Sequence, residues 1–134
     1  MAWSYAFSTQ AGTGKNLCQD AVAIQCDHES LAIAISDGAG SATYSNSAAS
    51  LVTKLAIERQ GLLWSDDWQL LLGILQEGLK ESASSQPIED YSCTLVVASI
   101  TPDGWRFLQV GDGGAVVLHG DSLSWLGTDP GEYM

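Results

Sequence analysis

The amino-acid sequence predicts an α+β fold in which strands come first, two helices follow and strands return at the end. Two observations lead to this prediction. Short apolar segments of strand length lie on both sides of the middle of the chain, and the middle carries apolar residues at helical spacing. With 134 residues, 46% of them hydrophobic, the chain has the size and composition of one folded domain over residues 1–134.

The N-terminal part of the sequence predicts three strands. Trp3, Tyr5 and Phe7 alternate with small residues, which predicts a half-buried first strand. Residues 21–26 and 31–35 are apolar and flank the polar residues 27–30, which together predict a β-hairpin. Antiparallel pairing puts the start of one strand beside the end of the next. We therefore expect Asp20 and Asp37, at the outer ends of the hairpin, to be near neighbours.

The middle of the sequence predicts two amphipathic helices. The first covers residues 45–63, and its apolar positions are Ala48, Ala49, Val52, Leu55, Ala56 and Leu62. The second is expected to open at Ser65, whose hydroxyl can cap it, with Asp66 and Asp67 near the positive end of the helix dipole. Its expected buried stripe is Trp68, Leu71, Leu72, Leu75 and Leu79.

The C-terminal part predicts a meander of strands. A polar loop over residues 82–87 leads to a strong strand at residues 93–100, and residues 102–104 form a tight turn. Residues 105–110 and 115–119 are the next strands, with a short one around residues 123–126. Strands before and after two helices favour an α+β layered fold over a parallel βαβ fold.

Charge and cysteine content narrow the classes of partner and compartment. Sixteen acidic residues against five scattered Lys and Arg give a net charge of −11, which argues against nucleic acid and anionic membranes as partners. The three cysteines have no metal-ligand spacing, and the N-terminus lacks a secretion signal. No apolar segment approaches the roughly 18 residues of a membrane span. The expected compartment is the cytoplasm.

Two groups of residues could bind a metal ion. Asp20 and Asp37 are expected at adjacent strand ends, where carboxylates can converge on one hard cation and the flexible Gly38 can add a backbone carbonyl. The alternative is that Asp37 and Gly38 form only a turn and that Asp20 is a cap. The second group, Asp112 among the glycines of residues 111–114, is explained by a hairpin turn when taken alone.

Four segments taken together resemble a known family. They are CQDA at residues 18–21, DGAGS at 37–41, CTLV at 93–96 and QVGDGG at 109–114. In this order, with two helices between the second and third, they resemble the metal-dependent PPM-type (type 2C) protein serine/threonine phosphatases. The DGAGS segment and residues 131–133 are most similar to a bacterial branch. The resemblance implies a sandwich of antiparallel β-sheets with flanking helices.

The resemblance also implies roles for individual residues. Asp37 resembles the aspartate that bridges two Mg²⁺ or Mn²⁺ ions, and Gly38 the residue whose carbonyl binds one of them. Asp20 resembles the carboxylate that holds a metal-bound water, and Asp112 the ligand of a weaker third metal. Lys15 stands where many members keep a phosphate-binding Arg, although an ordinary solvated Lys fits the position equally. The implied reaction is hydrolysis of phosphoserine or phosphothreonine by a metal-activated water, with Asp37 and Asp20 as the catalytic residues.

The sequence departs from the family in two ways. Gly113 and Gly114 replace the Ser-Arg pair that often follows the aspartate of the third metal. The family's domain is nearly twice as long, and two further metal aspartates belong to a C-terminal half that this sequence does not contain. We therefore expect the N-terminal portion of a phosphatase whose substrate is a phosphoprotein, with self-association through uncovered sheet edges.

Two other classes of function stay open at this point. One is a non-catalytic pseudophosphatase, or a signalling and interaction module, with the same fold. The other is an unrelated acidic α+β binding domain. Close approach of Asp20 and Asp37 favours the family over the unrelated domain.

Overall fold

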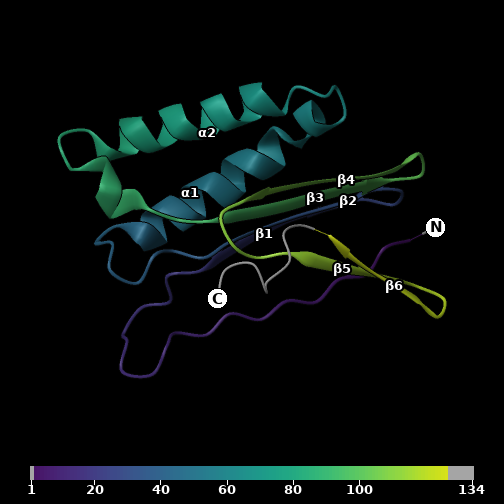
Figure 1. Cartoon of the computed structure of the whole chain (residues 1–134), viewed down its shortest axis with the longest axis horizontal. Coiled ribbons are helices and arrows are strands. Elements are labelled where there is room, and N and C mark those ends of the chain that lie inside the picture. The colour runs from purple at the N-terminus through teal and green to yellow at the C-terminus, as the bar shows by residue number, and fades with distance from the viewer. Residues whose placement is uncertain (1, 127–134) are drawn as a thin grey trace.

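An antiparallel four-stranded sheet forms the centre of the protein. The computed structural model describes residues 2–126. The sheet has the order β1-β2-β3-β4, and each strand is antiparallel to its neighbours (Figure 1). The strands are β1 (Ala21–Cys26), β2 (Leu31–Ser36), β3 (Leu95–Thr101) and β4 (Gly104–Val110). The predicted hairpin of β1 and β2 is confirmed, and so is the tight turn between β3 and β4.

Two helices lie on one face of this sheet (Figure 1). They are α1 (Ser45–Glu58) and α2 (Trp68–Ala83), and short 3₁₀ helices follow each of them, η1 (Gln60–Leu63) and η2 (Ile88–Tyr91). Three alanines of α1, at positions 48, 49 and 56, are fully buried. Small side chains let the helix backbone approach β1 and β2 closely. The α+β class with antiparallel strands and two helices is therefore confirmed.

The hydrophobic core lies between the helices and the sheet. Alternate residues of each strand face the helices, among them Ala34 of β2 and Val97 of β3, which pair in register. Leu71 and Leu75 of α2 complete this core with Val52 of α1. Each fully buried Val or Leu side chain contributes about 1.5–3 kcal/mol relative to an exposed one. The core thus fixes the strand register, and with it the position of the strand ends.

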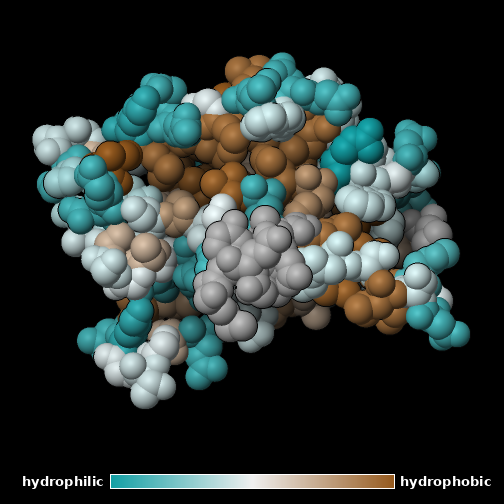
Figure 2. All heavy atoms as spheres, viewed as in Figure 1, coloured by the Kyte–Doolittle hydropathy of each residue, from teal (hydrophilic) through white to brown (hydrophobic). Residues whose placement is uncertain are grey.

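A separate two-stranded sheet follows β4. Strands β5 (Ala115–His119) and β6 (Ser122–Leu126) pair with each other, and in Figure 1 they lie on the side of the main sheet opposite the helices. The paired residues Leu118 and Leu123 are each 69% exposed. Figure 2 shows hydrophobic residues at the surface between the helices and the sheet, and again on this hairpin. The hairpin presents apolar surface to the outside.

The predicted first strand is wrong. Residues 2–10 form no strand, and Tyr5 and Phe7 are 52% and 62% exposed. Trp3 instead lies beside the β1–β2 turn, where its Nε1 donates a hydrogen bond to the carbonyl of Glu29 at 3.0 Å. Alternation of apolar and small residues predicts a strand only if a neighbouring strand supplies hydrogen bonds, and none pairs with this segment.

The predicted helix boundaries need correction. The first helix gives way to η1 after Glu58, and the second begins at Trp68 rather than Ser65. Asp66 has a φ of 56°, in the left-handed region, so a helix cannot pass through it. The Ser65 hydroxyl donates to the carbonyl of Leu62 at 3.2 Å and does not cap α2. Trp68, expected in the buried stripe, is 46% exposed.

The predicted polar loop is shorter than expected, because α2 continues to Ala83. Between residues 2 and 126, neither helix is both long and apolar enough to cross a membrane. The expectation for residues 131–133 falls outside the described residues.

Candidate metal centre

The pairing of β1 with β2 brings Asp20 and Asp37 together. Ala21 pairs with Ser36, so the two aspartates are the next residues beyond one end of the hairpin. Both line a cavity of about 250 Å³, together with Lys15 and Gly38. The Asp20 side chain also acts on Asp37, since its hydrogen bonding and its charge are among the causes that raise the pKa of the Asp37 carboxyl. The predicted proximity of Asp20 and Asp37 is therefore confirmed.

The surroundings of Asp37 disfavour its negative charge. Partial burial is the largest effect that raises the pKa of its carboxyl, followed by the hydrogen bond with Asp20 and the charges of Asp20 and Asp112. The positive charge of Lys15 acts in the opposite direction. A neighbouring carboxylate disfavours the charged form, and a bound cation would offset this effect. The pair is therefore suited to a positively charged ligand.

The backbone around Asp37 is held by β3. Asp37 N donates to Thr94 Oγ1 at 3.0 Å, and Thr94 N donates to the carbonyl of Asp37 at 2.9 Å. Gly38 continues this contact through a bridge to Cys93. These bonds fix the backbone on both sides of the Asp37 side chain, although the carboxyl itself is exposed. The segment at residues 93–94 thus supports the aspartate from the adjacent strand.

Gly38 is required by close packing. Its N–H donates to the carbonyl of Gln19 at 3.2 Å. A Cβ at this position would lie 2.5 Å from that same oxygen and 2.9 Å from Ser45 Cβ. Because both neighbours are held by secondary structure or hydrogen bonds, no larger residue fits without moving the backbone. The glycine allows the Asp37 loop to pass between the start of β1 and the start of α1.

Gln19 links three parts of the site, and its position next to Asp20 is the one feature of the sequence that points to this role. Its Oε1 accepts a hydrogen bond from Lys15 Nζ at 2.6 Å. Its Nε2 donates to Ser45 Oγ at 2.9 Å, and Ser45 is fully buried at the first position of α1. The Lys15 ammonium therefore lies beside the aspartates and is positioned by Gln19.

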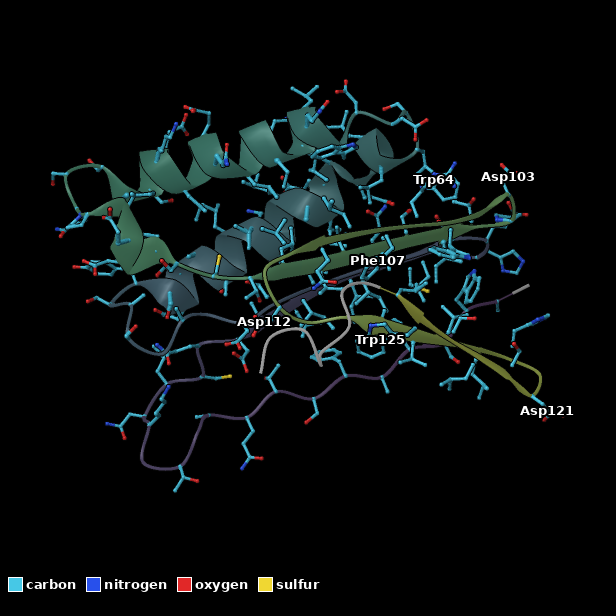
Figure 3. The ribbon with its side chains drawn as sticks, in the orientation of Figure 1. Trp64, Asp103, Phe107, Asp112, Asp121 and Trp125 are labelled. Carbon is cyan, nitrogen blue, oxygen red and sulfur yellow. The ribbon has the colours of Figure 1, made fainter. Side chains whose placement is uncertain are left out.

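Asp112 lies on the other side of Asp37. It follows β4 in the loop that leads to β5, as Figure 3 shows, and lines a second cavity of about 220 Å³ with Asp37 and Thr94. Gly111, with a φ of 81°, makes the turn out of β4. The negative charge of Asp112 contributes to raising the pKa of the Asp37 carboxyl. Nevertheless, in the part of the chain that the structure describes, no three Asp, Glu, His or Cys side chains are grouped closely enough to hold a metal ion.

The Asp20 and Asp37 carboxylates supply some of the ligands that one divalent cation needs. Two carboxylates are hard oxygen ligands of the kind that Mg²⁺ and Mn²⁺ prefer, and both line one cavity that is open to water. Mg²⁺ commonly keeps several waters and takes only one or two protein carboxylates. A pair of closely spaced metal ions needs more anionic ligands than residues 2–126 bring together.

The fold and the site define a class: an α+β domain with a carboxylate pair at the end of an antiparallel hairpin, suited to a divalent cation. The sequence matches the protein phosphatase 2C family over residues 10–134. The chain belongs to this family.

One similar protein agrees with this family, and one solved structure shows the same fold. The chain is 29% identical to serine/threonine-protein phosphatase 3 of Escherichia coli (strain K12), in an alignment covering 99% of this chain and 60% of that protein. A crystal structure of RsbX in complex with magnesium has the same fold, with a TM-score of 0.64 and 18% identity. The match covers 88% of this chain and 55% of RsbX. The chain thus spans little more than half the length of these proteins.

Proposed function

We propose that this chain supplies the N-terminal part of the active site of a serine/threonine phosphoprotein phosphatase that depends on Mg²⁺ or Mn²⁺. The observation that carries the proposal is that Asp20 and Asp37 line one cavity at the open end of the hairpin. Membership of the protein phosphatase 2C family supports the type of reaction, and the E. coli relative supports a phosphoserine or phosphothreonine substrate.

The proposed roles follow the geometry of the cavity. Asp37 holds a cation with its carboxylate, and the Gly38 carbonyl is a further ligand. Asp20 orients water at the same site. When bound at these residues, divalent cations would supply the charge that lowers the pKa of water and polarises a phosphoryl group. The proposed complement is two ions and a weaker third. Asp112, on the far side of Asp37, is the proposed ligand of the third.

Lys15 is the proposed binding residue for the substrate phosphate. Its ammonium is in the same cavity as both aspartates and is held by Gln19 at 2.6 Å. A lysine offers a point charge rather than the two-pronged contact of an arginine. We therefore expect Lys15 to attract the phosphoryl group without fixing its orientation.

Calorimetric titration with Mn²⁺ tests the metal site. The chain should bind Mn²⁺ weakly, and Asp37→Ala should abolish this binding, because the remaining aspartate alone cannot offset dehydration of the ion. Asp103→Ala, in the turn between β3 and β4, is the matched control and should leave the affinity unchanged. Equal Mn²⁺ affinity in Asp37→Ala and the unaltered chain would place the site elsewhere.

A phosphothreonine peptide assay with Mn²⁺ tests the reaction. We expect little or no hydrolysis by the 134-residue chain itself, since its described residues hold only part of a two-metal site. Hydrolysis at the usual rate of a protein phosphatase would show that the chain has ligands beyond those identified. A chain that binds Mn²⁺ at Asp37 and never hydrolyses the peptide, even when extended to the length of its relatives, would instead fit a non-catalytic module.

A further inference from the structure

The outer side of the helix pair carries a groove that the proposed reaction does not use. It has a volume of about 730 Å³. All the residues that line it belong to α1 or α2. Its apolar walls are Leu51 and Leu55 from α1 and Leu70 and Ile74 from α2. The groove lies where the two helices pack against each other, and it is open to solvent.

Two glycines of α2 shape this groove. Gly78 is explained by packing, because a Cβ there would lie 2.7 Å from Leu55 Cδ1. Packing does not explain the glycine at position 73, since a Cβ there would meet no atom within 4 Å. Glycine inside a helix is less favourable than alanine, because its backbone loses more conformational freedom on folding. Gly73 therefore keeps a hollow open at the expense of helix stability.

The apolar surface of α2 extends beyond what the fold buries. Leu71 and Leu75 face the core, whereas Leu70, on the groove, is 49% exposed. The groove side of α2 is therefore apolar at Leu70 and Ile74, and there is open space in front of Gly73.

The charged residues that line the groove are both acidic. Glu77 and Glu81 lie one helical turn apart on α2. Lys80 forms an exposed ion pair with Glu77 at 3.0 Å but is not among the lining residues. Positive charge on a ligand would complement these two carboxylates, and apolar side chains would complement the leucine and isoleucine walls. The net charge of −11 disfavours nucleic acid and anionic lipid, whereas a basic polypeptide combines both features.

We propose that the groove between α1 and α2 binds a basic amphipathic helix of a partner protein. Apolar side chains of that helix enter the hollow above Gly73, and its Lys or Arg residues face Glu77 and Glu81. This is the helix-in-groove mode of recognition, in which residues three and four apart act as anchors. The proposed site is separate from the aspartate pair and goes beyond the proposed phosphatase reaction.

A fluorescent peptide tests the proposal on the whole chain. The probe is an 18-residue helical peptide of Leu, Ala and Lys with one apolar face, and binding is followed by fluorescence anisotropy. A peptide of the same composition with a scrambled order, which has no apolar face, is the control for charge alone. We expect the amphipathic peptide to bind at least tenfold more tightly than the scrambled one.

Variants locate the binding. Gly73→Leu should fill the hollow and weaken binding at least tenfold, and Gly73→Ala should weaken it less while raising the melting temperature.

The double change Glu77→Lys with Glu81→Lys should also weaken peptide binding tenfold or more. Asp103→Lys with Asp121→Lys makes the same change in net charge in two turns remote from the groove (Figure 3) and should have a smaller effect. Equal binding of both peptides, equal loss in the two double variants, or unchanged affinity in a folded Gly73→Leu would each overturn the proposal.

Discussion

Gly38 shows how one residue type determines the shape of the site. The carbonyl of Gln19 and the first turn of α1 approach it so closely that only a hydrogen atom fits in place of a side chain. The neighbouring Asp37 is exposed, so its side chain is not restricted in size by close packing. The conformation of the aspartate loop therefore depends on the residue beside the aspartate.

Gly38→Ala should lower the free energy of unfolding by about 1–3 kcal/mol, because the added methyl group displaces backbone on two sides. It should also weaken Mn²⁺ binding by moving Asp37. Urea unfolding and calorimetry measure the two effects. Gly61→Ala is a suitable control, since a Cβ at Gly61 meets no atom within 4 Å. Equal stability of both variants would contradict the packing argument.

Gln19 is expected to stabilise the start of α1. Gln19→Ala removes the donor to the buried Ser45 hydroxyl and the acceptor for Lys15 Nζ. Loss of a partner for a buried polar group costs about 1–3 kcal/mol. Urea unfolding should show this loss, whereas Gln25→Ala, at an exposed position of β1, should change stability by less than about 0.5 kcal/mol. Similar values for the two variants would show that the Gln19 bridge is not stabilising.

At the scale of elements, the β1–β2 turn makes stability depend on pH. The Asp27 carboxylate accepts hydrogen bonds from Ser30 Oγ at 2.7 Å, Ser30 N at 2.8 Å and Glu29 N at 2.9 Å. The Ser30 hydroxyl makes the largest contribution to lowering the pKa of Asp27 below its ordinary value of 3.8. The folded protein therefore holds the ionised form better than the unfolded chain does.

This stabilisation is present above pH 3.8 and is lost as the pH falls through the lower pKa of the folded state. Asp27→Asn should consequently reduce stability at pH 6 and have a smaller effect at pH 2.5. Urea unfolding at the two pH values measures the difference. Asp103→Asn, in the other turn, is the control. An effect of Asp27→Asn that is equal at both pH values would contradict the assignment to the charged form.

The same elements show what the sequence could and could not predict. The β1–β2 hairpin was predictable because two short apolar segments joined by a polar turn are local signals, and its register then brought Asp20 to Asp37. The support of Asp37 by Thr94 could not be predicted, since it joins residues 57 positions apart. The predicted strand around Tyr5 failed because pairing is a property of the fold. The left-handed φ at Asp66 likewise left no local signal that would move the start of α2.

At the scale of the whole molecule, apolar surface remains uncovered on the side opposite the helices. Ile35 of β2 and Trp105 of β4 are each 48% exposed, and Leu118 and Leu123 of the hairpin are 69% exposed. Contiguous exposed apolar surface favours association. A second copy of the chain, with the same surface, is the proposed partner.

Sedimentation velocity should accordingly show a mass that rises with concentration. Leu118→Thr with Leu123→Thr should shift the population toward monomer, because the change removes apolar area from the hairpin while threonine keeps its strand preference. Leu17→Thr, at a residue that is 56% exposed outside the hairpin, serves as the comparison. A monomer at all concentrations in the unaltered chain would exclude this association.

The bonds between Asp37 and Thr94 also close a long loop. Both helices lie in residues 38–93, so the ends of this segment meet beside the aspartate. Closing a loop of this length costs about 3–4 kcal/mol of chain entropy, and that cost must be met before the contact can form. Asp37 therefore acquires its surroundings only when the helical segment has docked. If Asp37 holds a cation as proposed, cation binding would draw the equilibrium toward the closed loop and so link metal affinity to folding.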